Sequence, residues 1–152
     1  MLNVCIMGFT ERRDREISNG TKDLYDHLKT RGLSAVLLRW DDHWPTVAQF
    51  VSWRRDQVNV FAYSWGCGYG AMELAKLLPD DKIENLVACD PVYHHPRLLG
   101  RVSHALFGSK TIQVPKGKVK RVIAYRQKKG IIIKGDPLSQ DDELNILEGA
   151  TH

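Results

Sequence analysis

Ser64 is the residue whose neighbours are best suited to chemistry. It follows residues 58–63, whose apolar side chains alternate as in a β-strand, and it precedes a helical pattern that stops at Pro79. Ala62 and Gly66, two positions to either side, are small, as is required where a strand turns sharply into a helix. A serine at the tip of such a turn is a candidate nucleophile.

The strand, turn and helix around Ser64 resemble the nucleophile turn of the α/β-hydrolase superfamily, which has small residues two positions before and after its serine. This sequence differs in Ala62, where glycine is commonest in the superfamily. The resemblance implies a reduced α/β-hydrolase fold, a three-layer α/β/α sandwich around a mainly parallel sheet. It also implies a serine hydrolase of the lipase, esterase or thioesterase type, which acts on a small ester or thioester and needs no metal or organic cofactor.

The same resemblance assigns the remaining catalytic roles. Asp90 follows the strand after the Ser64 strand, where a subset of the superfamily's lipases carries its acid, and Asp136 is the reserve candidate. His152 ends a Gly-Ala-Thr-His sequence after the last predicted strand, where the superfamily carries its general base. The order Ser64, Asp90, His152 is the superfamily's order of nucleophile, acid and base.

Backbone N–H groups near Ser64 are the expected stabilisers of an oxyanion. The N–H of Trp65 stands at the start of the helix, whose dipole has its positive end at the turn. By resemblance, the loop after the first predicted strand supplies the second N–H, from Phe9 or alternatively from Thr10. The polar stretch at 11–16 (ERRDRE) is expected to be an exposed loop beside the site.

Residues 91–118 are too long for a plain connection between two strands. We expect a short helix over about 96–107 that covers one side of the site. The apolar contacts expected for a substrate there come from Tyr93, Leu106 and Phe107. A helix that only covers the sheet explains the same pattern equally well.

Other uses of these residues stay open. Ser64 would also serve as a helix cap. Gly66, Gly68 and Ala71 spell GxGxxA after a strand, as in a nucleotide-binding α/β domain, with Asp90 at a suitable distance for a ribose.

Three further assignments fit less well. Cys67 near a helix start is a candidate reactive thiol, but its helical phase turns it toward the sheet. His94 and His95 are a candidate metal site, although adjacent histidines on a loop diverge. The alternative for His152 is a terminal histidine without a catalytic role.

Composition limits the class of protein. A chain of 152 residues predicts a single domain, 1–152, with room for a core but none for a lid domain of ordinary size. The sequence has no run of about 18 apolar residues and no signal segment, so we expect a soluble, cytoplasmic protein that does not contact a membrane. Cys5, Cys67 and Cys89 are odd in number and lie in apolar segments, which predicts reduced, buried thiols.

The net charge of +4 is unevenly distributed, because residues 91–135 contain eleven Lys and Arg and no Asp or Glu. A solvated basic face explains this, and the absence of a nucleic-acid motif argues against a nucleic-acid partner. The functional alternatives are attraction of an anionic substrate, or a non-catalytic hydrolase-fold module whose basic face binds a polyanion.

Apolar periodicity predicts the rest of the sheet and its first helices. Strands are expected at 2–7, 34–40, 58–63, 86–89, 119–125 and 144–147, and helices at 18–30 and 45–54. The expected order of the strands across the sheet is 2-1-3-4-5-6.

Overall fold

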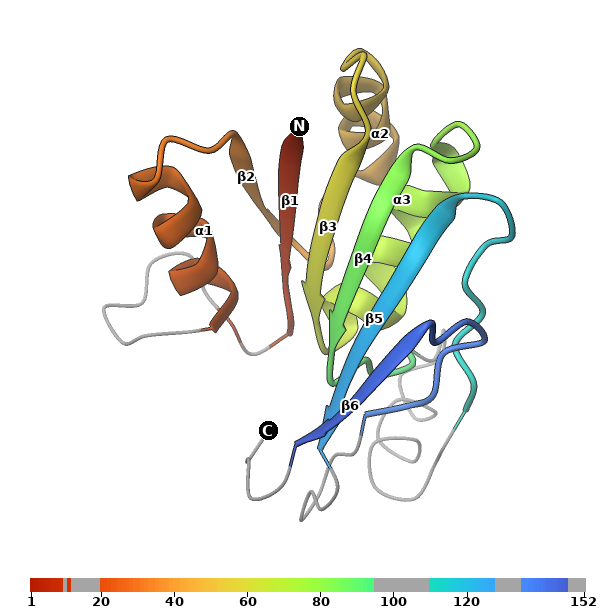
Figure 1. Ribbon diagram of the computed structural model, residues 1–152. Coiled ribbons are helices and arrows are strands. Elements are labelled where there is room, and N and C mark those ends of the chain that lie inside the picture. The colour runs from red at the N-terminus through yellow and green to blue at the C-terminus, as the bar shows by residue number, and fades with distance from the viewer. Residues whose placement is uncertain (10, 12–19, 95–109, 128–134, 148–152) are drawn as a thin grey trace.

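The computed structural model describes residues 1–9, 11, 20–94, 110–127 and 135–147. In these residues six parallel strands form one sheet in the order β2-β1-β3-β4-β5-β6, which confirms the predicted order (Figure 1). The strands are β1 (Leu2–Met7), β2 (Ala35–Arg39), β3 (Val58–Tyr63), β4 (Ile83–Cys89), β5 (Val119–Gln127) and β6 (Glu143–Leu147). The fold is therefore of the α/β class.

Helices connect the first four strands. They are α1 (Gly20–Thr30), α2 (Trp44–Ser52), and a π-helix, η1 (Gly66–Ala71), that continues directly into α3 (Met72–Leu77). The chain crosses the sheet in one direction from β1 to β2 and in the other direction from β2 to β3. Right-handed crossovers therefore place α1 on one face and α2 with α3 on the other. Figure 1 shows α2 and α3 behind the sheet.

The alternation along β3 explains how the sheet joins its helices. Val58, Val60 and Ala62 are buried on one face, whereas the residues between them are half-buried. Those three pack with Val51 of α2 and Leu74 of α3 in the main hydrophobic core. Every residue of β1 is buried, because α1 packs against this strand from the opposite face. Apolar burial thus fixes the register of the central strands.

The boundaries of the predicted elements are confirmed within a few residues. β4 starts earlier than predicted, at Ile83, and β5 ends later than predicted, at Gln127. The helix after Ser64 is present, but its first turns are π-helical. The short helix predicted over 96–107 lies outside the described residues. In the part of the chain that the structure describes, no helix combines the length and the apolar character needed to cross a membrane.

Candidate active site

The strand order reverses between β1 and β3, and the candidate site lies at this point. In open α/β sheets, ligands bind outside the carboxyl ends of the strands where the order reverses. Gly8 follows β1 and Ser64 follows β3, so both lie at that edge. A Cβ atom added at Gly8 would lie 3.0 Å from the Cβ of Ser64, so the two strand-end turns are in contact.

Ser64 has a strained backbone. Its φ of 52° lies in the left-handed region, which a residue with a side chain adopts at an energetic cost. Its N–H donates to the carbonyl of Cys89 on β4 (3.0 Å), and its carbonyl accepts the N–H groups of Cys67 (3.1 Å) and Gly68 (3.0 Å). The adjacent strand and the π-helix therefore hold the serine at the tip of a sharp turn.

Glycines are required beside this turn because the backbone approaches them closely. A Cβ at Gly66 would lie 2.6 Å from the carbonyl oxygen of Ile6, and one at Gly68 would lie 1.8 Å from that of Val92. Both glycines therefore accommodate the protein's own chain. Since Val92 occupies the space at Gly68, this contact argues against the nucleotide-binding alternative, in which the second glycine lets a pyrophosphate approach.

Asp90 lies at the end of β4, directly beside Ser64. It also has a positive φ, 42°, and it is 5% exposed. Its N–H donates to the carbonyl of Tyr125 (2.7 Å), and its Oδ1 accepts the N–H of Gln127 (2.8 Å), both on β5. Strand pairing therefore fixes both the backbone and the carboxylate of Asp90 at the same edge as Ser64.

The phenol of Tyr63 lies near the carboxylate of Asp90. Burial is the largest influence, and the nearby carboxylates of Asp90 and Glu11 add to it, so that the pKa of Tyr63 is raised to about 12. The phenol is therefore neutral at physiological pH and lies close to two carboxylates.

The predicted base, His152, lies outside the described residues, but the strand that leads to it is described. β6 runs parallel to β5, and Leu147 at its end pairs with Gln127. Gln127 is the residue whose N–H binds the carboxylate of Asp90. The end of β6 is therefore separated from Asp90 by β5, and it lies five residues before His152 in the sequence.

The loop after β1 brings Phe9 against Trp65, the two residues predicted to stabilise an oxyanion. Their ring centroids are 4.6 Å apart. Glu11 orders this loop, because its carboxylate accepts the N–H of Gly8 (2.8 Å) and both the N–H (2.9 Å) and the hydroxyl (2.7 Å) of Thr21. Glu11 lies outside any helix or strand, as expected of a loop, but it is half-buried and bonded inward rather than exposed. Thr10 and residues 12–16 lie outside the described residues.

An aromatic cluster that sequence reasoning missed lies across the carboxyl edge. The ring of Trp65 contacts those of Trp40 (5.2 Å between centroids) and His94 (4.8 Å), and the ring of Tyr69 contacts His94 (4.9 Å). Phe9 completes the cluster and is 59% exposed. The available signal was that Phe9, Trp40 and Trp65 each stand within two residues of the end of a different strand.

Asp136, the reserve acid, holds backbone in place. It is 3% exposed, and its two carboxylate oxygens accept the N–H of Tyr93 (2.7 Å) and the N–H of Lys110 (3.1 Å). Tyr93, predicted to contact substrate, lines a cleft beside α3. Leu106 and Phe107, the other predicted contacts, lie outside the described residues.

The three cysteines are free thiols, as predicted, although Cys89 is half-buried rather than buried. Burial raises the pKa of Cys5 to about 12 and that of Cys89 to about 11, and it also raises the pKa of Cys67. Raised values argue against Cys67 as a reactive thiol. Among the described residues no group of three or more metal-ligating side chains occurs, and His95 lies outside them.

Comparisons with known proteins identified no relative of this chain. No protein-family model matches the chain, and neither a curated protein nor a solved structure matches it. The α/β class and the strand order therefore rest on the structure itself.

Proposed function

We propose that this chain is a serine hydrolase that cleaves an ester or thioester through an acyl-enzyme on Ser64. The observation that carries the proposal is the backbone of Ser64, a buried serine with φ of 52° at the point where the strand order reverses. A strained residue persists only where the surrounding structure over-determines it, and such residues cluster at active sites. A serine that only capped the helix would need no left-handed backbone.

The neighbouring residues support this role. Asp90 is fixed at the end of the adjacent strand, in a position to orient an imidazole. β6, which precedes His152 in the sequence, pairs with β5, the strand whose Gln127 binds Asp90. The turn that carries Phe9 contacts the turn that carries Trp65. In this proposal the backbone N–H groups of these two residues, on different loops, are the donors to the oxyanion.

The reaction then follows the serine hydrolase scheme. His152 takes the proton of the Ser64 hydroxyl while the oxygen attacks the acyl carbon, and the N–H groups of Trp65 and Phe9 stabilise the oxyanion. His152 returns the proton to the leaving alcohol or thiol, which departs. Asp90 keeps the imidazole oriented in both steps. Water, deprotonated by His152, attacks the acyl-enzyme, releases the acid and restores Ser64.

A fluorophosphonate probe tests the proposal directly. It forms a covalent adduct only with a serine that is activated as a nucleophile. We expect one adduct per wild-type chain, none on Ser64→Ala, and normal labelling of Ser52→Ala, which removes an exposed hydroxyl at the end of α2. The readout is the mass of the intact protein.

Two results would contradict the proposal. A folded wild-type chain that gains no mass would leave the non-catalytic binding module as the better description. Equal labelling of wild type and Ser64→Ala would show that another residue reacts with the probe. Hydrolysis of 4-nitrophenyl acetate by the same three proteins gives an independent measurement.

A further inference from the structure

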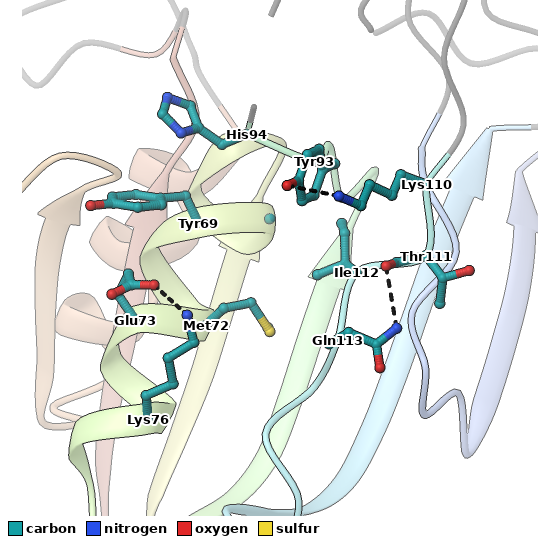
Figure 2. A pocket seen from close by; sticks show the side chains of 11 residues that line it. Tyr69, Met72, Glu73, Lys76, Tyr93, His94, Lys110, Thr111, Ile112 and Gln113 are labelled. Carbon is teal, nitrogen blue, oxygen red and sulfur yellow. Dashed lines mark hydrogen bonds and ion pairs between the residues drawn. The ribbon is translucent and has the colours of Figure 1, made fainter. Parts of the chain in front are cut away.

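A cleft of about 610 Å³ lies beside the sheet, on the side of η1 and α3. Figure 2 shows Tyr69, Glu73 and Lys76 on the helical wall and Lys110, Ile112 and Gln113 on the opposite wall. The second wall is the extended segment that precedes β5. A volume of this size is typical of sites for small organic ligands.

Apolar and aromatic side chains form part of the lining of the cleft. Met72 and Ile112 line it and are only 4% and 2% exposed. The rings of Tyr69, Tyr93 and His94 line it as well. The half-buried rings of Tyr69 and Tyr93 provide contact for an apolar or aromatic body above Met72 and Ile112, since such pockets bind mainly by burial of apolar surface.

Positive charge lies at the edge of the cleft. The ammonium of Lys110 stands 4.2 Å from the centre of the Tyr93 ring and donates to the Tyr93 hydroxyl (3.0 Å). Among the described residues it is paired with no carboxylate, whereas the ammonium of Lys76 is paired with Glu73 (2.6 Å). The charged side chains that line the cleft therefore sum to one positive charge, which Lys110 supplies.

The position of Lys110 is fixed by the same carboxylate that fixes Tyr93. Asp136 accepts the backbone N–H groups of both residues, at 3.1 Å and 2.7 Å. The pairing of the ammonium with the tyrosine is therefore supported by two backbone hydrogen bonds to the buried carboxylate of Asp136. A preorganised cation loses less conformational entropy when it binds an anion.

We propose that this cleft binds a small amphipathic anion, with its apolar or aromatic body between Tyr69, Met72 and Ile112 and its anionic group at Lys110. This site does not require Ser64, and it goes beyond hydrolysis. It also gives part of the basic segment at 91–135 a specific use, because Lys110 belongs to that segment.

A matched pair of fluorescent probes tests both halves of the proposal. 8-Anilino-1-naphthalenesulfonate is an aromatic anion, and N-phenyl-1-naphthylamine has the same rings without the sulfonate. We expect the full chain to bind one equivalent of the anion, with an affinity that falls about fivefold in Lys110→Met and falls further as salt is added. Binding of the neutral probe should be the same in wild type and Lys110→Met.

Control variants separate the cleft from the general charge of the protein. Lys120→Met removes an exposed lysine that is paired with Glu84 on the neighbouring strand, and it should leave the affinity for the anion unchanged. Tyr69→Ala should weaken both probes. Circular dichroism establishes that each variant is folded.

Several outcomes would overturn the proposal. Equal affinity of wild type and Lys110→Met for the anion would remove Lys110 from the site. An equal loss in Lys120→Met would show binding by net charge alone, and binding of several equivalents would show a nonspecific surface. Neither probe contains an ester, so the result is independent of whether Ser64 is a nucleophile.

Discussion

Two edges of the same sheet carry residues in the left-handed conformation, and they use it differently. Asp81, with φ of 54°, lies in the exposed turn before β4, at the amino edge, where its N–H donates to the carbonyl of Gly117 (2.8 Å). Ser64 and Asp90, with φ of 52° and 42°, lie at the carboxyl edge and are 7% and 5% exposed. At the amino edge the left-handed backbone forms an exposed turn. At the carboxyl edge the same conformation holds a buried hydroxyl next to a buried carboxylate.

The difference shows where strain is informative. Aspartate adopts the left-handed conformation more readily than most residues, so the turn at Asp81 needs no functional explanation. Serine lacks this preference, and glycine would relieve the strain at Ser64 without loss of the turn. The presence of a hydroxyl there, beside a buried carboxylate, is the observation on which the proposed site rests.

The largest effect on activity is expected when glycine replaces Ser64, and the comparison is the same substitution at Asp81. Ser64→Gly should raise the free energy of unfolding by about 1 kcal/mol, because the strain of a left-handed serine is removed. It should lower the proposed esterase activity by about 10⁴-fold, because the proposed nucleophile is lost. Asp81→Gly should change stability by less than about 0.5 kcal/mol and leave activity unchanged. Urea unfolding and hydrolysis of 4-nitrophenyl acetate measure the two quantities.

Ser64→Ala is the control for this comparison, because it removes the hydroxyl and keeps the strain. It should be inactive and no more stable than wild type. If Ser64→Gly proves less stable than Ser64→Ala, the left-handed backbone is not a cost at this position and the comparison between the edges fails.

The second prediction compares the roles of two buried aspartates, Asp90 and Asp136, by replacing each with asparagine. Asp90→Asn keeps an oxygen for the N–H of Gln127, and the proposed activity should fall about 10²-fold to 10⁴-fold. Asp136→Asn must turn its amide nitrogen toward one of two backbone N–H donors. It should therefore lose about 2 kcal/mol of stability and keep its activity within a few-fold. The opposite pattern would make Asp136 the catalytic acid.

A third prediction concerns the close contact beneath Ser64. Gly68→Ala would place a methyl group 1.8 Å from the carbonyl oxygen of Val92, so the chain before Tyr93 must shift. We expect a loss of about 3 kcal/mol in the free energy of unfolding. Gly20→Ala in α1 is the matched control, because a Cβ there meets no atom within 4 Å, and it should be neutral or stabilising. Equal effects of the two substitutions would contradict the packing described at η1.

The strands of the sheet could be predicted from the sequence because the patterns that identify them lie within short segments of the chain. The alternation in 58–63 and the continuous apolar run in 2–7 identify strands, and handedness and short connections then limit the strand order. The sharp turn at Ser64 was also recognisable, since the small residues that it needs are two positions away. Each of these features depends on neighbours in the chain.

The features that the sequence did not predict depend on residues far apart in the chain. The carbonyl groups of Ile6 and Val92 that approach Gly66 and Gly68 are not revealed by any local pattern. The aromatic cluster joins side chains that follow several different strands. The cleft at Lys110 forms only when the segment before β5 lies against α3. Such contacts become visible only when the strand order and the loop paths are known together.

The smallest expected effect is on the pH dependence of stability and concerns Tyr63, which precedes Ser64. The pKa of its phenol depends on the charged groups at the carboxyl edge. Its pKa is raised from 10.0 to about 12 by burial and by the carboxylates of Asp90 and Glu11. The folded chain therefore holds the phenolic proton more tightly than the unfolded chain. This contribution to stability is complete below pH 10 and is lost as the pH rises from 10 to 12. Tyr63→Phe should show a shallower loss of stability over that interval, measured by urea unfolding at pH 9 and pH 11. A loss as steep as that of wild type would mean that the phenol ionises normally, and that the carboxyl edge is no more negative or buried at Tyr63 than an exposed turn.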